Sequence, residues 1–305
     1  MRVIIWTVFL GLILKVGSAQ ACQGMTLHLS QPAPYFSSEG TNSGTFSVVV
    51  AGNTTAGACD YFLAFDYGSG SSFSTRALRL SGESWPYQLY KDAGSLYVLK
   101  RAADASSCSE VLCGNLASGS HYISQSLPYS MVIDYSNLWR RAGRYTETVR
   151  VTLYQGTVGS ASEVASVYKT ISFDSQKKYD LSLVPTGGGF DLNARDHVMN
   201  FPGMSTGMSR SADLILKYNS GAKIFAESTN GGRLRHVSQP DLISYEMRVN
   251  GVLVPITYWS QILSKNGTSP ASGDVNPVVV TIGDITGKKK GQYKDTIRLT
   301  IQSNE

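Results

Sequence analysis

Short runs in which apolar and polar residues alternate one by one recur along most of the chain. They include TFSVVV (45–50), SLYVLK (95–100), YSMVIDY (129–135), TVRVTLY (148–154), ADLILKY (212–218) and TIRLTI (296–301). A period of two residues places the apolar side chains on one face of a β-strand. The runs are rich in Val, Ile, Tyr and Thr, and Gly, Ser, Asn and Asp separate them. The pattern therefore predicts an all-β chain of antiparallel sandwiches with little helix.

One of these runs occurs twice, at a fixed offset of 148 residues. RAGRYTETVRVTLYQG (141–156) returns as KKGQYKDTIRLTIQSN (289–304), with Gly143 matching Gly291, Tyr145 matching Tyr293, Thr148 matching Thr296, Arg150 matching Arg298 and Thr152 matching Thr300. Each copy is expected to form one strand with its apolar side in a core. A repeat at nearly half the chain length predicts two tandem sandwich domains, residues 22–175 and 178–305.

The two copies differ in the residues that come after them. After Gly156 comes another strand-like run, EVASVYKTISF (163–173), whereas only residues 301–305 come after Thr300. The first sandwich is therefore expected to be complete and the second to lack one strand. An unfilled sheet edge promotes aggregation unless a strand from a partner pairs with it.

Residues 1–21 have the pattern of a secretory signal peptide. Arg2 precedes an apolar run, Val3 to Leu14, and Ala19–Ala21 offer a small-residue cleavage site. The mature protein is therefore expected to be exported and soluble. Loss of Arg2 and Lys15 lowers the formal charge from +5 to +3. Basic and aromatic residues do not interleave around the basic run GKKKG (287–291), so no nucleic-acid partner is expected.

All four cysteines lie after this segment, in the first half of the chain. An even number in an exported protein predicts two disulfides, with three possible connectivities. Cys108–Cys113 as a local link and Cys22–Cys59 as a link between strands are favoured. The spacing lacks a paired C-x-x-C and no histidine lies near, so a zinc site is disfavoured. No metal or cofactor is predicted.

Several segments together resemble the spore coat protein U family, whose members include subunits of the archaic chaperone–usher pili of Gram-negative bacteria. In the first half these are TTAGACDYFLAFDYG (54–68), STRALRLSGESWPYQLYKD (74–92) and AGRYTETVRVTLY (142–154). In the second half they are NSGAKIFAESTNGGRLRH (219–236), ISYEMRVNG (243–251), PVVVTIGD (277–284) and GQYKDTIRLTI (291–301). The absence of cysteine from the second half departs from many such pilins.

The resemblance implies an immunoglobulin-like pilin fold whose missing strand is donated, first by a periplasmic chaperone and then by a neighbouring pilin subunit, with assembly at an outer-membrane usher. Cys22 comes directly after the predicted cleavage site, leaving no donor segment of its own. The chain is thus expected to be a two-domain tip adhesin that mediates surface attachment and biofilm formation at the fimbrium tip. Ile297, Leu299 and Ile301 are expected to line the acceptor groove.

The adhesive residues are predicted from the alternating direction of successive antiparallel strands. If every strand reverses, the loops around 81–85, 102–127 and 156–163 lie at the outer end of the first domain, and NLWRRAG (137–143) lies at the domain junction. The apolar residues of the outer set are Trp85, Val111, Leu112, Leu116, Tyr122 and Val158. Exposed on loops, they would form an adhesive surface for an unidentified ligand; the alternative is that several belong to the core.

The same sequence is compatible with two alternative functions. A secreted coat or matrix protein would have the same fold with two complete sandwiches. A secreted serine hydrolase would use Ser205 in GMSTG (203–207), which fits G-x-S-x-G. That motif needs a strand-to-helix turn, and no helix is predicted after it, so the protein is not expected to be an enzyme.

Overall fold

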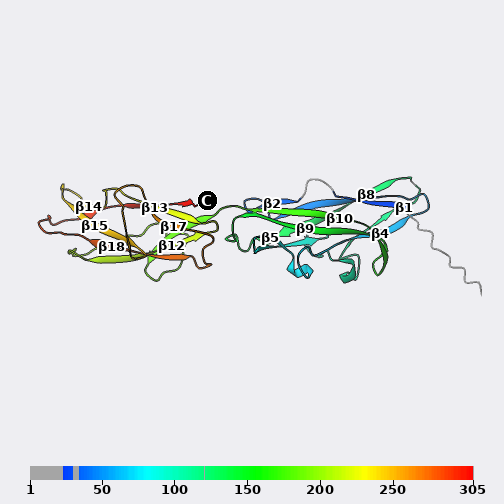
Figure 1. The fold of residues 1–305 in the computed structure, drawn as a ribbon, viewed down its shortest axis with the longest axis horizontal. Coiled ribbons are helices and arrows are strands. Elements are labelled where there is room, and N and C mark those ends of the chain that lie inside the picture. Colours follow the sequence, from blue (N-terminus) through cyan, green and yellow to red (C-terminus); the bar gives the residue numbers. More distant parts are fainter. Residues whose placement is uncertain (1–22, 30–33, 120, 305) are drawn as a thin grey trace, which may run out of the picture.

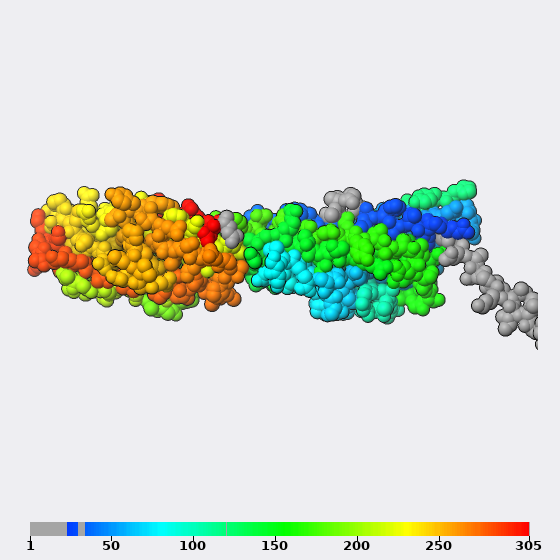
Figure 2. Space-filling model, viewed as in Figure 1, coloured from blue at the N-terminus to red at the C-terminus, as the bar shows by residue number. Residues whose placement is uncertain are grey.

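The computed structural model describes residues 23–29, 34–119 and 121–304, and these form two β-sandwiches placed end to end (Figure 1). In the space-filling view the molecule is elongated, and the two halves of the chain occupy its two ends (Figure 2). The described residues contain only two short 3-10 turns, η1 (Phe73–Thr75) and η2 (Ala102–Asp104). Among them no helix is long and apolar enough to cross a membrane. The all-β prediction is confirmed.

The first sandwich has two layers joined by a hairpin. Its strands are β1 (Gln23–Leu29), β2 (Tyr35–Ser37), β3 (Ser43–Asn53), β4 (Cys59–Phe65), β5 (Ala77–Leu80), β6 (Glu83–Tyr90), β7 (Leu112–Leu116), β8 (Ile123–Ile133), β9 (Gly143–Thr157) and β10 (Ser160–Ser175). One layer has the order β1-β3-β8-β6 and the other the order β7-β4-β9-β10-β2. The β5–β6 hairpin links them, since β5 pairs with β9 and β6 with β8.

The second sandwich also has two layers, but fewer strands lie beside its copy of the repeated strand, β20. Its strands are β11 (Tyr179–Pro185), β12 (Ser209–Tyr218), β13 (Ala222–Ser228), β14 (Arg233–His236), β15 (Leu242–Val249), β16 (Val252–Val254), β17 (Ser260–Lys265), β18 (Asp274–Ile282), β19 (Tyr293–Lys294) and β20 (Ile297–Ser303). One layer has the order β11-β12-β18-β15-β14-β19, with β16 beside β15, and the other is β17-β13-β20. Each sandwich encloses its own apolar core.

The repeated G-x-Y motif makes the same turn in both sandwiches. Gly143 and Gly291 have φ of +136° and +152°, which side chains other than glycine rarely adopt. Two residues later the Tyr145 hydroxyl donates to the Arg141 carbonyl (2.7 Å), and the Tyr293 hydroxyl donates to the Lys289 carbonyl (2.8 Å). Both are tyrosine corners, in which the ring fixes the entry of the chain into the closing strand. The repetition in sequence therefore reflects one structural element used twice.

Asn219 joins the two sandwiches at their junction. Its side chain is fully buried, and its amide nitrogen donates to the carbonyls of Arg140 (3.1 Å) and Gln176 (2.9 Å). Its side-chain oxygen accepts from Lys178 N (2.7 Å), and its own carbonyl accepts from Ala142 N (2.9 Å). The predicted position of 137–143 at the domain junction is confirmed by the contacts of Arg140 and Ala142.

The rule that successive strands reverse direction fails more than once in the first sandwich: β4 and β5, for example, are both antiparallel to β9 and so run the same way. The failure between β6 and β7 is the one that affects the predicted surface. The run SLYVLK (95–100) forms no strand, and only Val98 makes an isolated bridge, with Tyr90. As a result β6 and β7 run in the same direction. The turn between β5 and β6 therefore lies at the junction end, where Arg79 pairs with Thr146, and not at the outer end as predicted. The outer end is formed by residues 54–58, 117–119, 121–122 and 157–159.

Candidate functional site

The repeated strand has a neighbour on each side in the first sandwich but not in the second. β9 pairs with β4 on one side and with β10 on the other, where the register runs from Ser160 opposite Thr157 to Ser175 opposite Gly143. β20 pairs with β13, from Ser228 opposite Ile297 to Ala222 opposite Ser303. Within the described ranges no strand pairs with the other edge of β20. The second sandwich has no counterpart of β10 there.

The inward side chains of the two strands differ in burial accordingly. Val149, Val151 and Leu153 on β9 are 1%, 1% and 0% exposed. Their counterparts at the offset of 148 residues, Ile297, Leu299 and Ile301, are only half-buried, although they pack against the second core. The same alternating pattern is therefore covered in one sandwich and left partly open in the other.

An apolar cavity of about 550 Å³ lies at this open edge. Ile297 and Leu299 of β20 line one side of it, and Leu181 and Leu183 of β11 line the other. Its remaining wall includes core residues of β15 and β18, which belong to the same layer as β11, namely Tyr245, Met247, Val278 and Val280. Protein interiors rarely leave voids larger than a water molecule. We call this space, bounded by β11 and β20, the groove.

A half-buried carboxylate, Asp295, lies at one end of the groove. Asp295 accepts hydrogen bonds from the hydroxyls of Tyr245 and Ser228 (2.6 Å each) and from Asn230 N (3.1 Å). Burial, together with this carboxylate, holds the pKa of the Tyr245 hydroxyl above its usual range. The polar groups at this end are satisfied within the chain, so the groove offers an incoming ligand mainly apolar surface.

Asp295 also has a counterpart in the first sandwich that our sequence interpretation missed. Glu147, 148 residues earlier, is buried and accepts hydrogen bonds from Ser69 N (3.1 Å) and Thr148 N (2.8 Å). Asp295 likewise accepts from Thr296 N (2.8 Å). In both sandwiches the acidic side chain connects the repeated strand (β9 or β20) to the loop that comes after the strand paired with it (β4 or β13). The sequence signal for this equivalence is the acidic residue that stands two positions after the tyrosine of each tyrosine corner.

The predicted adhesive surface on the first sandwich is largely wrong. Trp85 and Val111 are fully buried, and Leu112 and Leu116 are 3% and 1% exposed. The Trp85 indole N–H donates to the Asp134 carbonyl (2.7 Å), and its ring lies 4.4 Å from that of Phe173. Trp85, Leu112 and Leu116 belong to the main core because β6 and β7 direct these side chains inward, whereas Val111, just before β7, is buried in a separate small cluster with Phe62 and Ala64.

The remaining two residues of that set lie at the outer end. Val158 is half-buried and packs against a small cluster around Phe62 and Val111. Only Tyr122 is well exposed, at 63%, and its hydroxyl lies 3.3 Å from Thr26 Oγ1. A single tyrosine does not form an apolar patch.

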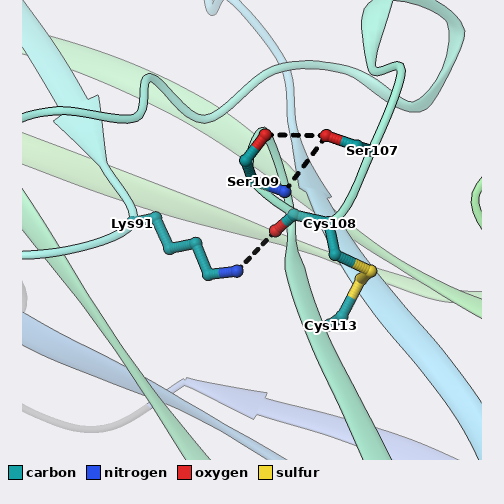
Figure 3. Close-up of a disulfide and its surroundings, with 5 residues drawn as sticks. All are labelled: Lys91, Ser107, Cys108, Ser109 and Cys113. Carbon is teal, nitrogen blue, oxygen red and sulfur yellow. Dashed lines mark hydrogen bonds between the residues drawn. A yellow bond between two sulfur atoms is a disulfide. The ribbon is translucent and has the colours of Figure 1, made fainter.

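The Cys108–Cys113 disulfide is confirmed and lies on the flank of the first sandwich (Figure 3). It links the connection after β6 to β7, and Lys91 Nζ donates to the Cys108 carbonyl. Cys59 is also disulfide-bonded, while its predicted partner, Cys22, lies outside the described residues. The disulfide therefore fixes a lateral loop and not the outer end.

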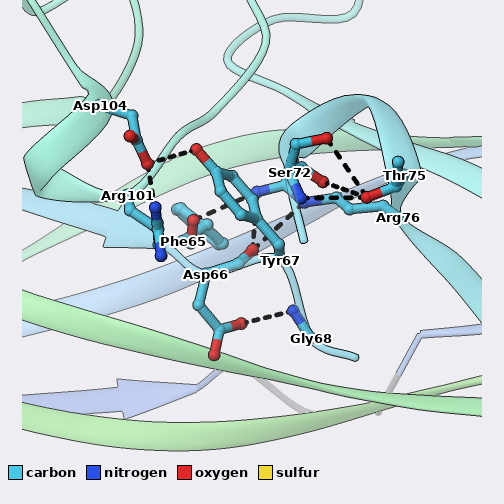
Figure 4. Close-up of polar contacts among 9 residues, drawn as sticks. All are labelled: Phe65, Asp66, Tyr67, Gly68, Ser72, Thr75, Arg76, Arg101 and Asp104. Carbon is cyan, nitrogen blue, oxygen red and sulfur yellow. Dashed lines mark hydrogen bonds and ion pairs between the residues drawn. The ribbon is translucent and has the colours of Figure 1, made fainter. Parts of the chain in front are cut away.

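A buried guanidinium organises the neighbouring flank loops (Figure 4). Arg76 donates to the carbonyls of Phe65 (3.2 Å) and Asp66 (2.8 Å), and burial lowers its pKa to about 10. The Tyr67 hydroxyl donates to Asp104 (2.6 Å), and Arg101 lies over the Tyr67 ring. Every polar group here has a partner within the chain, so the cluster holds loops in place.

The hydrolase alternative lacks its structural context. Gly203–Gly207 leads into strand β12, and no helix comes after Ser205, so the backbone does not form a nucleophile elbow. In the part of the chain that the structure describes, no group of three or more His, Cys, Asp or Glu side chains is placed to hold a metal ion.

Comparisons with known proteins give one family match. Residues 22–152 match the sequence model of the Spore Coat Protein U domain. No curated protein sequence matches the chain.

Three solved structures are among those similar to this chain. One is the CsuC–CsuE chaperone–tip adhesion subunit complex of the archaic chaperone–usher Csu pili of Acinetobacter baumannii (12% identity, 91% of this chain and 100% of that chain, TM-score 0.41). Another is the CupB6 tip adhesin of Pseudomonas aeruginosa (9%, 93% and 96%, 0.40). The third is CfaE, the adhesive subunit of CFA/I fimbria of enterotoxigenic Escherichia coli (13%, 80% and 82%, 0.37).

Proposed function

We propose that this chain, whose residues 22–152 form a Spore Coat Protein U domain, is an adhesive subunit at the tip of a chaperone–usher pilus. Its second sandwich accepts a β-strand from another polypeptide into the groove between β11 and β20. One observation carries the proposal: the apolar positions that are fully buried on β9, beside β10, are only half-buried on β20, which has no such neighbour among the described residues.

The first sandwich indicates what kind of ligand would fill the groove, because β10 occupies the equivalent position there. β10 covers β9 with alternate side chains facing inward, and Ala165, Val167, Ile171 and Phe173 are its inward apolar residues. An extended strand with the same alternation would bring two such side chains to Ile297 and Leu299. It would also pair with the free backbone groups of β20, as in strand addition to other sheet edges. A small compact ligand could cover the apolar wall of the groove, but it would not pair with the backbone N–H and C=O groups along the edge of β20.

The partners are inferred from this chemistry. A periplasmic chaperone would supply the strand before assembly, and a neighbouring pilin subunit would supply it in the fibre, after passage through an outer-membrane usher. The first sandwich then points away from the fibre, because the groove belongs to the second sandwich and the two sandwiches lie on opposite sides of the junction (Figure 1). In this arrangement the outer end is available for attachment to a surface and for biofilm formation.

Thermal unfolding of the full chain with a synthetic peptide tests strand acceptance. The peptide has the sequence of β10, Ser160–Ser175, because that strand fills the equivalent position in the first sandwich. At a peptide concentration 100-fold above Kd, we expect the transition of the second sandwich to rise by roughly 5–10 °C. A scrambled peptide should have no effect.

Two variants on β20 sharpen the test. Leu299→Asp places a charge in the groove and should abolish the rise, whereas Gln302→Asp, at an exposed position of the same strand, should leave it intact. A transition that does not respond to peptide would mean that the second sandwich is complete. It would then favour the stand-alone coat or matrix protein.

A further inference from the structure

The connection between β11 and β12 is much longer than its strands require. β11 and β12 are antiparallel neighbours, with Pro185 opposite Ala212, so a short turn could join them. Residues 186–208 form the connection instead and contain neither helix nor strand. Ordered connections of this length are uncommon and are often functional lids.

Part of this connection lies over the groove. In Asp196–Phe201 every second residue is half-buried, namely His197, Met199 and Phe201, while Val198 between them is 82% exposed. All three half-buried residues line the same cavity as Ile297 and Leu299, and Met199 and Phe201 pack against the second core. This segment therefore presents the alternating inward side chains that an added strand would present. We call residues 196–201 the plug.

The plug is held mainly by apolar contact. Among the described residues its backbone makes one hydrogen bond to the rest of the chain, from exposed Arg210 Nε to the Asn200 carbonyl (3.2 Å). It pairs with neither β20 nor β11 as a strand. An added strand would gain the ladder hydrogen bonds that the plug does not make, so it has an energetic advantage over the plug.

The plug is tethered at both ends. Before it, Arg195 forms an ion pair with Asp180 of β11, and the Ala194 carbonyl accepts from Leu183 N (2.8 Å). After it, Gly207 N donates to the Ile282 carbonyl (2.9 Å). Displacement would therefore swing the segment outward between fixed points without unfolding the sandwich.

We propose that residues 196–201 are a removable plug that protects the groove until a donor strand displaces it, an inference that rests on the proposed function. With the plug in place, Ile297 and Leu299 are shielded and the open edge is less prone to self-association. The donor strand binds the state in which the plug has moved away. Weakening the plug raises the population of that state and with it the apparent affinity for the strand.

Association of a fluorescent β10 peptide with the full chain, monitored by stopped flow, tests the plug. In Met199→Ser/Phe201→Ser we expect an association rate about tenfold above that of the unmodified chain and an unchanged dissociation rate, because the plug is absent from the bound state. Asn200→Ser, a change at an exposed position of the same segment that does not line the groove, should leave both rates unchanged.

A milder variant covers the case in which the double variant fails to fold. Arg195→Ala removes the ion pair to Asp180 and the hydrogen bonds from the same guanidinium to the Leu192 and Leu181 carbonyls, and it should raise the association rate about two- to threefold. If peptide binds equally fast to all variants, the plug is disproved while strand acceptance stands. If peptide binds to none, including the unmodified chain, both proposals are disproved.

Discussion

β9 and β20 carry the same alternating pattern and the same tyrosine corner, yet one is a central strand and the other an edge strand. The apolar side of β9 is fully covered because β10 comes next in the chain and returns alongside it. The apolar side of β20 is half-covered, and a cavity of about 550 Å³ remains beside it. The difference teaches that a strand's own sequence specifies which face is apolar, while its neighbours decide how far that face is buried.

The largest effect is expected from damage to the strand that only the first sandwich has. Phe173 on β10 is fully buried against Trp85, Tyr135 and Tyr145. Phe173→Ala should lower the free energy of unfolding of the first sandwich by about 3–5 kcal/mol in chemical denaturation. Tyr168→Ala, at an exposed position of the same strand, should change it by less than about 0.5 kcal/mol. Equal losses would show that β10 does not cover the core.

A matched pair at the offset of 148 residues measures the difference in burial directly. Leu153→Ala should cost the first sandwich about 2.7–5 kcal/mol, whereas Ile301→Ala should cost the second only about 1 kcal/mol in the absence of donor peptide. With β10 peptide bound, the cost of Ile301→Ala should increase, because the added strand covers the side chain. An Ile301→Ala loss as large as that of Leu153→Ala without peptide would contradict an open edge.

The tyrosine corners provide a smaller version of the same comparison. Tyr145→Phe removes a hydroxyl from a fully buried ring and leaves the Arg141 carbonyl without its partner, so a loss of about 1–2 kcal/mol is expected. Tyr293 is only half-buried and water can replace its hydroxyl, so Tyr293→Phe should cost less than about 1 kcal/mol. The measurement is denaturant unfolding of each variant, and a reversed order would show that burial does not determine the cost.

The smallest effect is a dependence on pH confined to the first sandwich. The ion pair with Lys100 and hydrogen bonds from Ser106 lower the pKa of Glu110 to about 2, from an ordinary value near 4.5. Because the pKa is lower in the folded state, the stabilisation is present above pH 4.5 and is lost as the pH falls towards 2. Glu110→Gln should therefore cost about 0.5–1 kcal/mol at pH 7 and almost nothing near pH 2, as measured by acid titration of unfolding. A constant difference across that range would rule out this ion pair as the cause.

Much of the fold could be predicted because period-two alternation is a local signal. It located β8, β9, β12 and β20, and the repeat indicated that β9 and β20 are equivalent. The prediction of a strand at 95–100 is wrong, because no neighbouring strand pairs with this alternating run and only Val98 makes a bridge. Because 95–100 forms no strand, β6 and β7 run in the same direction, and the predicted position of the β5–β6 turn at the outer end is wrong.

The candidate site could be predicted only in part, for a related reason. Ile297, Leu299 and Ile301 were identified from the repeat, but the groove depends on β11 and on core residues distant in sequence. The alternation of His197, Met199 and Phe201 is short and lies among glycines and polar residues, so it resembled a loop. The burial of Trp85 depends on its contact with Phe173, which no local pattern contains.

The bonding of Asn219 has a mechanical consequence. One side chain that holds Arg140, Gln176 and Lys178 together makes three segments resist bending at once, so a sideways load cannot open the junction by breaking a single contact. A pull at the outer end of the first sandwich is then transmitted along the long axis of the molecule to the edge strands of the second. In the proposed fibre, the two sandwiches would therefore act as one stiff unit that is attached through the groove.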